Sequence, residues 1–266
     1  MHGVQGAASR LADREGGGSV TKRIFASCLG AAFLFFVWLA VAETVRLPII
    51  PSPIRVAENI GAIFFGTIAV HGAYSLGRIL AGVLLAVGVG LPLGVSMGWS
   101  RRTDRLLSPL VYLTYPVPKI ALLPIVMLIF GLGDGSKTIM LFLILVFQVV
   151  IAVRDSIRAI PEEAFYPLAS LGAPFRVVLW EVLLPASLPK FMTAIRVAMA
   201  TAISVLFFTE TFGTQYGMGY FIMDAWLRVN YLEMYSGIVV LSGMGLLLFG
   251  VLDLAERYFC RWQGHL

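Results

Sequence analysis

The side chain with the clearest chemical potential in this sequence is Lys119, which stands in the middle of an apolar segment. Inside a membrane an ammonium group is costly, so such a residue is a functional candidate. If it faces a water-filled path, it lowers the barrier to an anion. The alternative is structural, because Pro116, Pro118 and Pro124 in the same segment free backbone carbonyls that a lysine can cap.

Four further side chains are candidates for the same path or for a gate across it. Glu210 ends a later apolar segment and precedes the glycine-rich run around Met218. Its carboxylate could hold a gate closed by bonding to the backbone or to a basic side chain, and a structural cap would use the same bonds. Gln148 could bond a substrate or a neighbouring helix. Gln215 and Met218 lie in the segment that we expect to form the outer gate.

Constellations for covalent or metal chemistry are missing from the sequence. The three histidines and the two cysteines are isolated from one another, so we expect no catalytic triad, metal site or disulfide framework. The run GLGDGSKT is close to a phosphate-binding loop, but Ser136 stands where the motif needs glycine and the run joins two apolar segments. We therefore expect no enzymatic activity and no cofactor or ATP site in this chain.

The composition indicates a membrane protein. Of the 266 residues, 59% are hydrophobic and only 13% are charged, whereas soluble domains carry about a quarter charged residues. The net charge of +5 is scattered over the ends of apolar segments, which does not favour a nucleic-acid partner. Because lipid offers the backbone no hydrogen-bond partners, the expected fold class is an all-α membrane protein.

Six apolar segments are candidates for crossing the membrane. They are expected at residues 24–42, 74–99, 106–131, 138–153, 188–208 and 236–254. Prolines should bend or break the third of them. Before them, residues 1–23 are expected to form a flexible cytoplasmic tail, so the transmembrane domain covers residues 24–260.

Two connecting segments are expected to have structure of their own. Residues 43–72 read as a mixed loop with an amphipathic or interfacial helix over 56–70. Residues 210–235 are aromatic and glycine-rich, as an outer re-entrant or gate segment would be. The second span also carries a small residue at every fourth position, which is typical of a close helix-packing face. These residues are Gly82, Ala86, Gly90, Gly94 and Gly98.

Basic residues are concentrated on one side of this topology. Arg101, Arg102, Arg105, Arg154 and Arg158 all fall on the side that also holds both chain ends, and few basic residues fall on the other side. By the positive-inside rule that side is the cytoplasm. We therefore expect a multi-pass protein of the bacterial inner membrane with cytoplasmic termini.

The longest charged and amphipathic connection is residues 161–190, PEEAFYPLASLGAPFRVVLWEVLLPASLPK. It predicts two short helices that are broken at Gly172-Ala173-Pro174, with Gly172 in the left-handed conformation. The second helix should stop at Leu184-Pro185. A compact helical knob of this kind, within a loop of about residues 155–187, suits insertion into a groove on a partner.

The spacing of Gly172, Val182 and Leu184-Pro185 resembles the EAA loop of permease subunits of bacterial ABC importers. The flanking sequence is similar to the nitrate/sulfonate/taurine branch of that family, and the resemblance covers residues 72–262. One departure concerns the acidic residue of the motif. In register with Gly172, the family's Glu-Ala-Ala falls on Tyr166-Pro167-Leu168, while the carboxylates of Glu162 and Glu163 lie earlier.

The resemblance implies a permease of the type I ABC importer kind that moves its substrate by alternating access. It implies two partner ATPase subunits that carry ATP and magnesium, a second and identical permease copy, and an extracytoplasmic solute-binding protein. The implied substrate is a small anion such as nitrate, a sulfonate or taurine. Contact with the ATPase would fall on Glu162, Glu163, Leu171, Gly172, Ala173 and Phe175. The alternative is a stand-alone channel or secondary transporter, which would not need this knob and would be expected to show inverted repeats.

Overall fold

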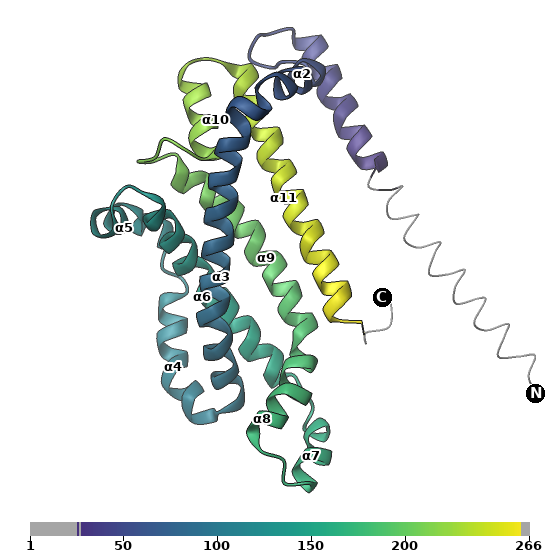
Figure 1. Cartoon of the computed structure of the whole chain (residues 1–266), viewed down its shortest axis with the longest axis vertical. Helices are drawn as coiled ribbons and strands as arrows, with labels where there is room; N and C mark the ends of the chain where they lie inside the picture. Colours follow the sequence, from purple (N-terminus) through teal and green to yellow (C-terminus); the bar gives the residue numbers. More distant parts are fainter. Residues whose placement is uncertain (1–25, 27, 262–266) are drawn as a thin grey trace, which may run out of the picture.

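The computed structural model describes residue 26 and residues 28–261, and every regular element in this part of the chain is helical. Figure 1 shows an elongated bundle with α2 and α10 at one end and α7 and α8 at the other. The all-α prediction is confirmed. The predicted tail over residues 1–23 lies outside the described residues.

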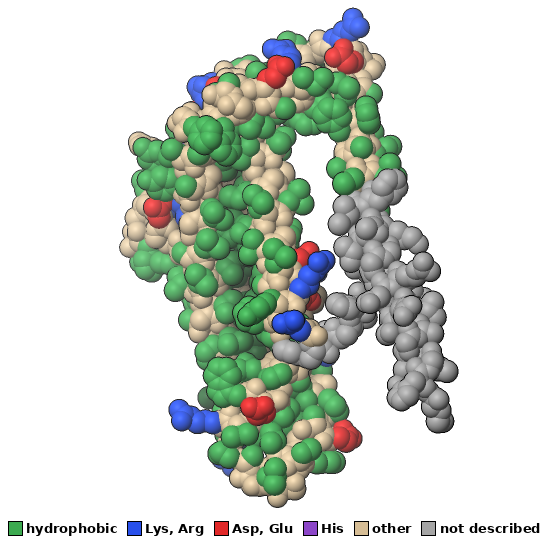
Figure 2. Space-filling view, turned by 45° about the vertical axis from the view of Figure 1, so that its right-hand side comes forward, with side chains coloured by type: hydrophobic (Ala, Val, Ile, Leu, Met, Phe, Trp, Pro, Cys, Tyr) green, Lys and Arg blue, Asp and Glu red, His purple; other side chains and the backbone are tan. Residues whose placement is uncertain are grey.

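Five helical segments of the described chain are long and apolar enough to cross a membrane, and a bent pair supplies a sixth. The five are Cys28–Val45, Pro53–Trp99, Asp134–Arg158, Phe175–Glu210 and Tyr231–Phe259. The bent pair is Arg101–Thr114 with Lys119–Phe130, at an angle of 78°. Six spans are thus confirmed when this pair counts as one, and Figure 2 shows the hydrophobic side chains that cover much of the long sides.

The second span is longer than the sequence predicts. Helix α2 (Pro53–Ile63), the π-helical segment η1 (Phe64–Ile68) and α3 (Ala69–Trp99) follow one another without a break. The helix that the sequence predicts over residues 56–70 is therefore present, but no loop separates it from the second span. No proline or polar run interrupts FFGTIAVHG, so the chain has no local reason to leave the helix there.

The third span is broken as predicted, but it begins earlier. Helix α4 (Arg101–Thr114) follows α3 after Ser100 alone, whose hydroxyl accepts a hydrogen bond from the Thr103 N–H at 3.3 Å. The segment expected as a cytoplasmic loop is therefore the first turn of α4. After Pro118, the 3-10 turn η2 (Lys119–Leu122) leads into α5 (Leu123–Phe130).

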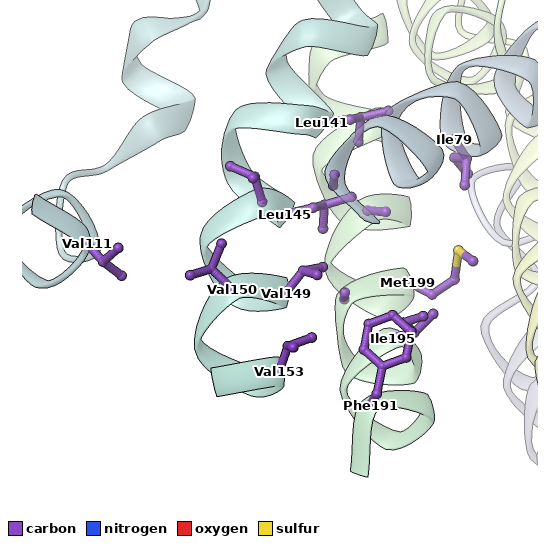
Figure 3. Packing of buried hydrophobic residues seen from close by; sticks show 14 of the residues in the cluster. Ile79, Val111, Leu141, Leu145, Val149, Val150, Val153, Phe191, Ile195 and Met199 are labelled. Carbon is purple, nitrogen blue, oxygen red and sulfur yellow. The ribbon is translucent and has the colours of Figure 1, made fainter. Parts of the chain in front are cut away.

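The core forms where α3 packs against α6 (Asp134–Arg158), and α9 (Leu184–Glu210) packs against α6 in turn. A Cβ atom added at Gly82 would lie 2.6 Å from the Leu141 side chain, and one at Gly94 would lie 2.6 Å from Val153. The small-residue face of the second span is therefore buried against α6. In Figure 3 Val149 and Leu145 of α6 lie on the side of that helix that faces Ile195 of α9.

The predicted knob lies at the lower end of the bundle in Figure 1. It consists of the 3-10 turn η3 (Glu162–Phe165), α7 (Tyr166–Ser170), α8 (Phe175–Val178) and the π-helical segment η4 (Leu179–Leu183). Between α7 and α8, Gly172 has φ +63°, so the left-handed turn is confirmed.

The second helix of the knob does not stop at Leu184-Pro185 as expected. It continues through η4 and α9 as one helical run from Phe175 to Glu210. A proline ring clashes with the carbonyl four residues earlier and offers no N–H. The wider π turn η4, which directly precedes α9 and its Pro185, takes up this defect where a break was predicted.

At the opposite end, the predicted outer segment contains the short helix α10 (Met218–Leu227), and α11 (Tyr231–Phe259) forms the last span. Asn230 caps α11, because its side chain accepts a hydrogen bond from the Glu233 N–H at 3.2 Å. Met218, Phe221 and Ile222 of α10 form a small apolar core with Ile68 and Leu241. The segment therefore packs on the bundle as a helix.

Candidate functional site

The most heavily bonded polar site in the described chain is centred on the carboxylate of Glu210, the last residue of α9, which is 1% exposed. The Ser75 hydroxyl lies 2.9 Å from Oε1 and 2.8 Å from Oε2. The Gly219 N–H donates to Oε2 at 2.9 Å, and Arg78 Nη1 donates to Oε1 at 2.6 Å. One carboxylate thus joins α3, α9 and the start of α10.

Arg78 extends this network to α6 and to the loop after α9. Its Nε and Nη2 donate to Asp134 Oδ1 at 2.8 and 2.5 Å. Its Nη1 also donates to the Tyr216 carbonyl at 2.8 Å, and Nη2 lies 3.2 Å from Thr214 Oγ1. Every nitrogen of the guanidinium therefore has a partner, which satisfies an arginine whose side chain is only 4% exposed.

Lys137 is a second buried cation nearby, at 0% exposure. Its Nζ donates to the carbonyl oxygens of Leu132 at 2.5 Å and Gly213 at 3.0 Å. This bond pair ties the turn before α6 to the loop after α9. We refer to Ser75, Arg78, Asp134, Lys137 and Glu210 together as the outer ion cluster, after the side on which the topology predicted from the sequence places them.

The outer ion cluster can hold one end of three spans together. Its two buried cations and its buried carboxylate are all paired, and a buried ion pair that loses one partner leaves an uncompensated charge. Separation of α3 from α9 at this end would therefore require several charge-assisted hydrogen bonds to break at once. Among the described residues, no group of three or more His, Cys, Asp or Glu converges as a metal site.

Of the five predicted path or gate residues, one belongs to this cluster and a second donates a hydrogen bond to it. Glu210 is its centre, and the bonds to Arg78 and to a backbone N–H are of the kind that the gate hypothesis requires. Met218 takes part through its N–H, which donates to Ser75 Oγ at 2.7 Å, while its side chain is core. Whether the cluster opens during transport stays a prediction.

Gln215 is exposed and lines a separate pocket of about 450 Å³ on α2, α3, α10 and α11, together with His71, Asp224, Arg228 and Glu233. Arg228 Nη2 lies 2.8 Å from both Asp224 Oδ2 and Glu233 Oε2. The hydrogen bond to Glu233, and after it the bond to Asp224, raises the pKa of Arg228. The charges of this pocket are thus mutually satisfied.

Lys119 caps backbone carbonyls, which is the structural alternative to a role in the path. Its Nζ donates to the carbonyl oxygens of Thr114 at 3.0 Å and Tyr115 at 3.1 Å, which end α4 at the break. The same ammonium lies 4.9 Å from the centre of the Phe147 ring on α6, a cation–π distance. Gln148, which follows Phe147 on α6, has a buried side-chain oxygen without a hydrogen-bond partner in the described part of the chain.

The knob residues are presented to the outside of the bundle. Leu171 is 80% exposed and Phe175 is 45% exposed. Glu162, Glu163 and Gly172 are also exposed, and Ala173 is half-buried. The knob is anchored by Trp99 at the end of α3, whose ring centre lies 5.9 Å from that of Phe165 and 5.4 Å from that of Phe175.

The sequence analysis missed the residues that pair with Glu210. Arg78 lies within the predicted second span, and the sequence analysis proposed no partner or role for it. The signal was present, because an ionisable residue inside a span calls for a partner. Also missed was Asp104 on α4, which accepts from Arg154 Nε at 2.5 Å and from Arg158 Nη2 at 2.7 Å on α6.

Comparison with known proteins agrees with this architecture. The taurine transport system permease protein TauC of Escherichia coli (strain K12) is 30% identical over 88% of this chain and 88% of its own length. The putative aliphatic sulfonates transport permease protein SsuC of Bacillus subtilis (strain 168) is 28% identical over 87% of this chain and 85% of its own. The formylaminopyrimidine transport permease protein ThiX of Halalkalibacterium halodurans is 27% identical over 86% and 92%.

The fold is that of a solved ABC transporter. A structure of inward facing conformations of the MetNI methionine ABC transporter superposes with a TM-score of 0.63 at 20% identity, over 76% of this chain and 98% of that chain. The family model for the binding-protein-dependent transport system inner membrane component matches residues 90–263. This chain therefore belongs to the family of binding-protein-dependent transport system inner membrane components, the permease subunits of ABC importers.

Proposed function

We propose that this permease subunit serves the import of a small anion of the sulfonate class. The observation that carries the substrate class is that two relatives, matched over most of their length, are named for taurine and for aliphatic sulfonates. Both substrates present a sulfonate group. A second candidate class is a neutral pyrimidine, because a third relative is named for formylaminopyrimidine.

The partners follow from the same proposal. Two ATPase subunits bind ATP and magnesium, this chain binds no cofactor, and a second and identical copy completes the path. An extracytoplasmic solute-binding protein delivers the substrate. The chain is a multi-pass protein of the inner membrane, and we place both termini and the knob in the cytoplasm because the basic residues favour that side.

The helical run from Phe175 to Glu210 supports a mechanical link between the two ends. It begins in the knob, beside Leu171, and ends at the carboxylate of the outer ion cluster. At about 1.5 Å per residue a run of this length spans the membrane. Closure of the ATPases would displace the knob, and the run would carry that displacement to Glu210, which alternating access requires.

The experiment that tests the coupling role compares two exposed leucines at opposite ends of the bundle. The full chain is co-expressed with its ATPase, and Leu171→Asp is compared with Leu227→Asp. The two side chains are 80% and 71% exposed, so neither substitution removes core packing. We expect Leu171→Asp to abolish co-purification or stimulated ATP hydrolysis, because an exposed apolar anchor dominates such interfaces.

Leu227→Asp on α10 should leave assembly with the ATPase unchanged. If both variants assemble and hydrolyse ATP like the unmodified complex, the knob is not the coupling element. If no ATPase co-purifies with the unmodified chain, a stand-alone channel or carrier becomes the better reading. The substrate class is then measured as uptake of taurine against a neutral pyrimidine into liposomes that hold the complete transporter.

A further inference from the structure

A pocket of about 680 Å³ lies between the knob and the lower ends of α3, α4 and α6. This volume is in the range of small-molecule sites, roughly 300–1,000 Å³. Its walls come from segments far apart in the sequence, including Trp99, Arg101, Arg105, Arg158 and Phe165. The ion pairs of Asp104 on α4 with Arg154 and Arg158 on α6 hold these segments together around it.

The arginines that line this pocket outnumber its carboxylates, and two of them have no ion-pair partner. Its three arginines face two carboxylates, Asp104 and Glu162, so the lining carries a net charge of +1. Asp104 is already engaged, because it accepts from Arg158 and from Arg154 and also from the Ser108 hydroxyl. Arg101 and Arg105 form no ion pair with any residue of the described chain.

A pocket lining with a net positive charge suits an anion, and the position of the pocket on the membrane helices indicates which kind of anion. Above the arginines, α4 exposes Leu106, Leu110 and Leu113 at 77%, 61% and 75%, three or four residues apart on one face. Such a stripe on a spanning helix suits acyl chains. Trp99, which lines the pocket, is of the residue type that sits at headgroup level in membrane proteins. The arginines therefore lie where a lipid phosphate would be.

We propose that this pocket binds a phosphate-bearing anion, and that its occupant is the headgroup of an anionic phospholipid. Arg101 and Arg105 are one turn apart on α4 and provide the two free guanidinium groups, which match phosphate oxygens in geometry. The stripe of leucines accommodates the acyl chains. Because Trp99 and Phe165 line the same pocket and pack on each other, the bound headgroup also contacts the base of the knob.

Binding is read on the purified full chain in neutral detergent by native mass spectrometry, without the ATPase. The probes are phosphatidylglycerol, phosphatidylcholine and inorganic phosphate as a competitor. We expect one retained phosphatidylglycerol per chain and weaker retention of phosphatidylcholine. Each basic residue near an anionic lipid contributes on the order of fivefold in affinity, so Arg101→Gln with Arg105→Gln should weaken retention roughly thirtyfold.

The matched control is Arg102→Gln. Arg102 lies in the same turn of α4 but does not line the pocket, so its removal should change retention less than twofold. A third variant, Glu162→Gln, removes a pocket carboxylate and should tighten retention. This opposite sign keeps the test valid if the double variant folds poorly.

The outcomes separate the proposal from its rivals. Displacement of the lipid by millimolar phosphate would show that free phosphate is a sufficient ligand, and resistance to it would show that the acyl chains contribute. Equal retention of both lipids, or an Arg102→Gln loss as large as that of the double variant, would overturn the site. None of these readouts depends on transport, so they stand apart from the proposed function.

Discussion

Arg78 on α3 and Glu210 on α9 form a buried ion pair, with 2.6 Å between Nη1 and Oε1 and side-chain exposures of 4% and 0%. The two residues are 132 positions apart. Around them the Ser75 hydroxyl, the Gly219 N–H and the Asp134 carboxylate complete the hydrogen bonding. Such a pair specifies how α3 and α9 sit at this end of the bundle.

Removal of the carboxylate by Glu210→Ala should strongly destabilise the protein. It leaves Arg78 buried with Asp134 as its remaining acid, and the loss of one partner from a buried pair costs about 3–5 kcal/mol. The measurement is the thermal unfolding midpoint of the purified chain in detergent. The control, Asp224→Ala, breaks an ion pair with the half-exposed Arg228 and should cost less than about 1 kcal/mol. Equal shifts for the two variants would contradict this assignment.

The close approach of α3 and α6 predicts opposite signs for two identical substitutions in one helix. In Gly94→Ala the new methyl group would lie 2.6 Å from Val153 Cβ and 2.9 Å from the Val150 carbonyl oxygen. Forced separation of packed elements costs about 1–3 kcal/mol. Gly88→Ala, also in α3, meets no heavy atom within 4 Å and should gain up to about 1 kcal/mol in helix propensity.

Both variants are measured by thermal unfolding against the unmodified chain. A destabilising Gly88→Ala, or a neutral Gly94→Ala, would show that the two helices are not packed in this register.

Replacement of Gly172 by a residue with a side chain should be unfavourable because of its backbone conformation. At φ +63° an added Cβ meets nothing within 4 Å, so the cost is backbone strain of about 1–2 kcal/mol. We expect Gly172→Ala to lower ATPase stimulation in the reconstituted complex, and Gly172→Asn to lower it less, because asparagine tolerates this conformation. Gly135→Ala in α6, where φ is not positive, is the matched control. Equal ATPase stimulation by Gly172→Ala and the control would show that coupling does not require glycine at this turn.

Lys119→Met separates the two roles of that lysine. The substitution leaves the part-buried Thr114 carbonyl and the exposed Tyr115 carbonyl without their ammonium donor, and the loss of hydrogen bonds to a charged group costs up to about 3 kcal/mol. We therefore expect a lower unfolding midpoint for Lys119→Met and a nearly normal one for Lys119→Arg. Unchanged stability together with lost anion uptake would instead indicate that the lysine acts on the substrate.

Much of the architecture could be predicted because its signals are local. Long apolar runs indicate spanning helices wherever they occur, and Pro116 and Pro118 indicate the break before η2. The left-handed Gly172 follows from the Gly-Ala-Pro sequence alone. One prediction failed where a defect could be absorbed, because at Pro185 a π turn continues the helix. The helix predicted over residues 56–70 is present, and the sequence did not show that the π-helical η1 joins it to α3 without a loop.

By itself the sequence determined that this is an all-α membrane protein with about six spans and an exposed helical knob, since each of these rests on residues that are neighbours along the chain. Only the tertiary structure decided that Arg78 pairs with Glu210, that Asp104 binds Arg154, and that Arg101 and Arg105 face a pocket beside the knob. Such pairings depend on which helices pack together and in what rotation. A single sequence indicates helix packing only through its stripes of small residues, which do not say which helix covers them. The partner of a buried charge is therefore known only once the helices are assembled.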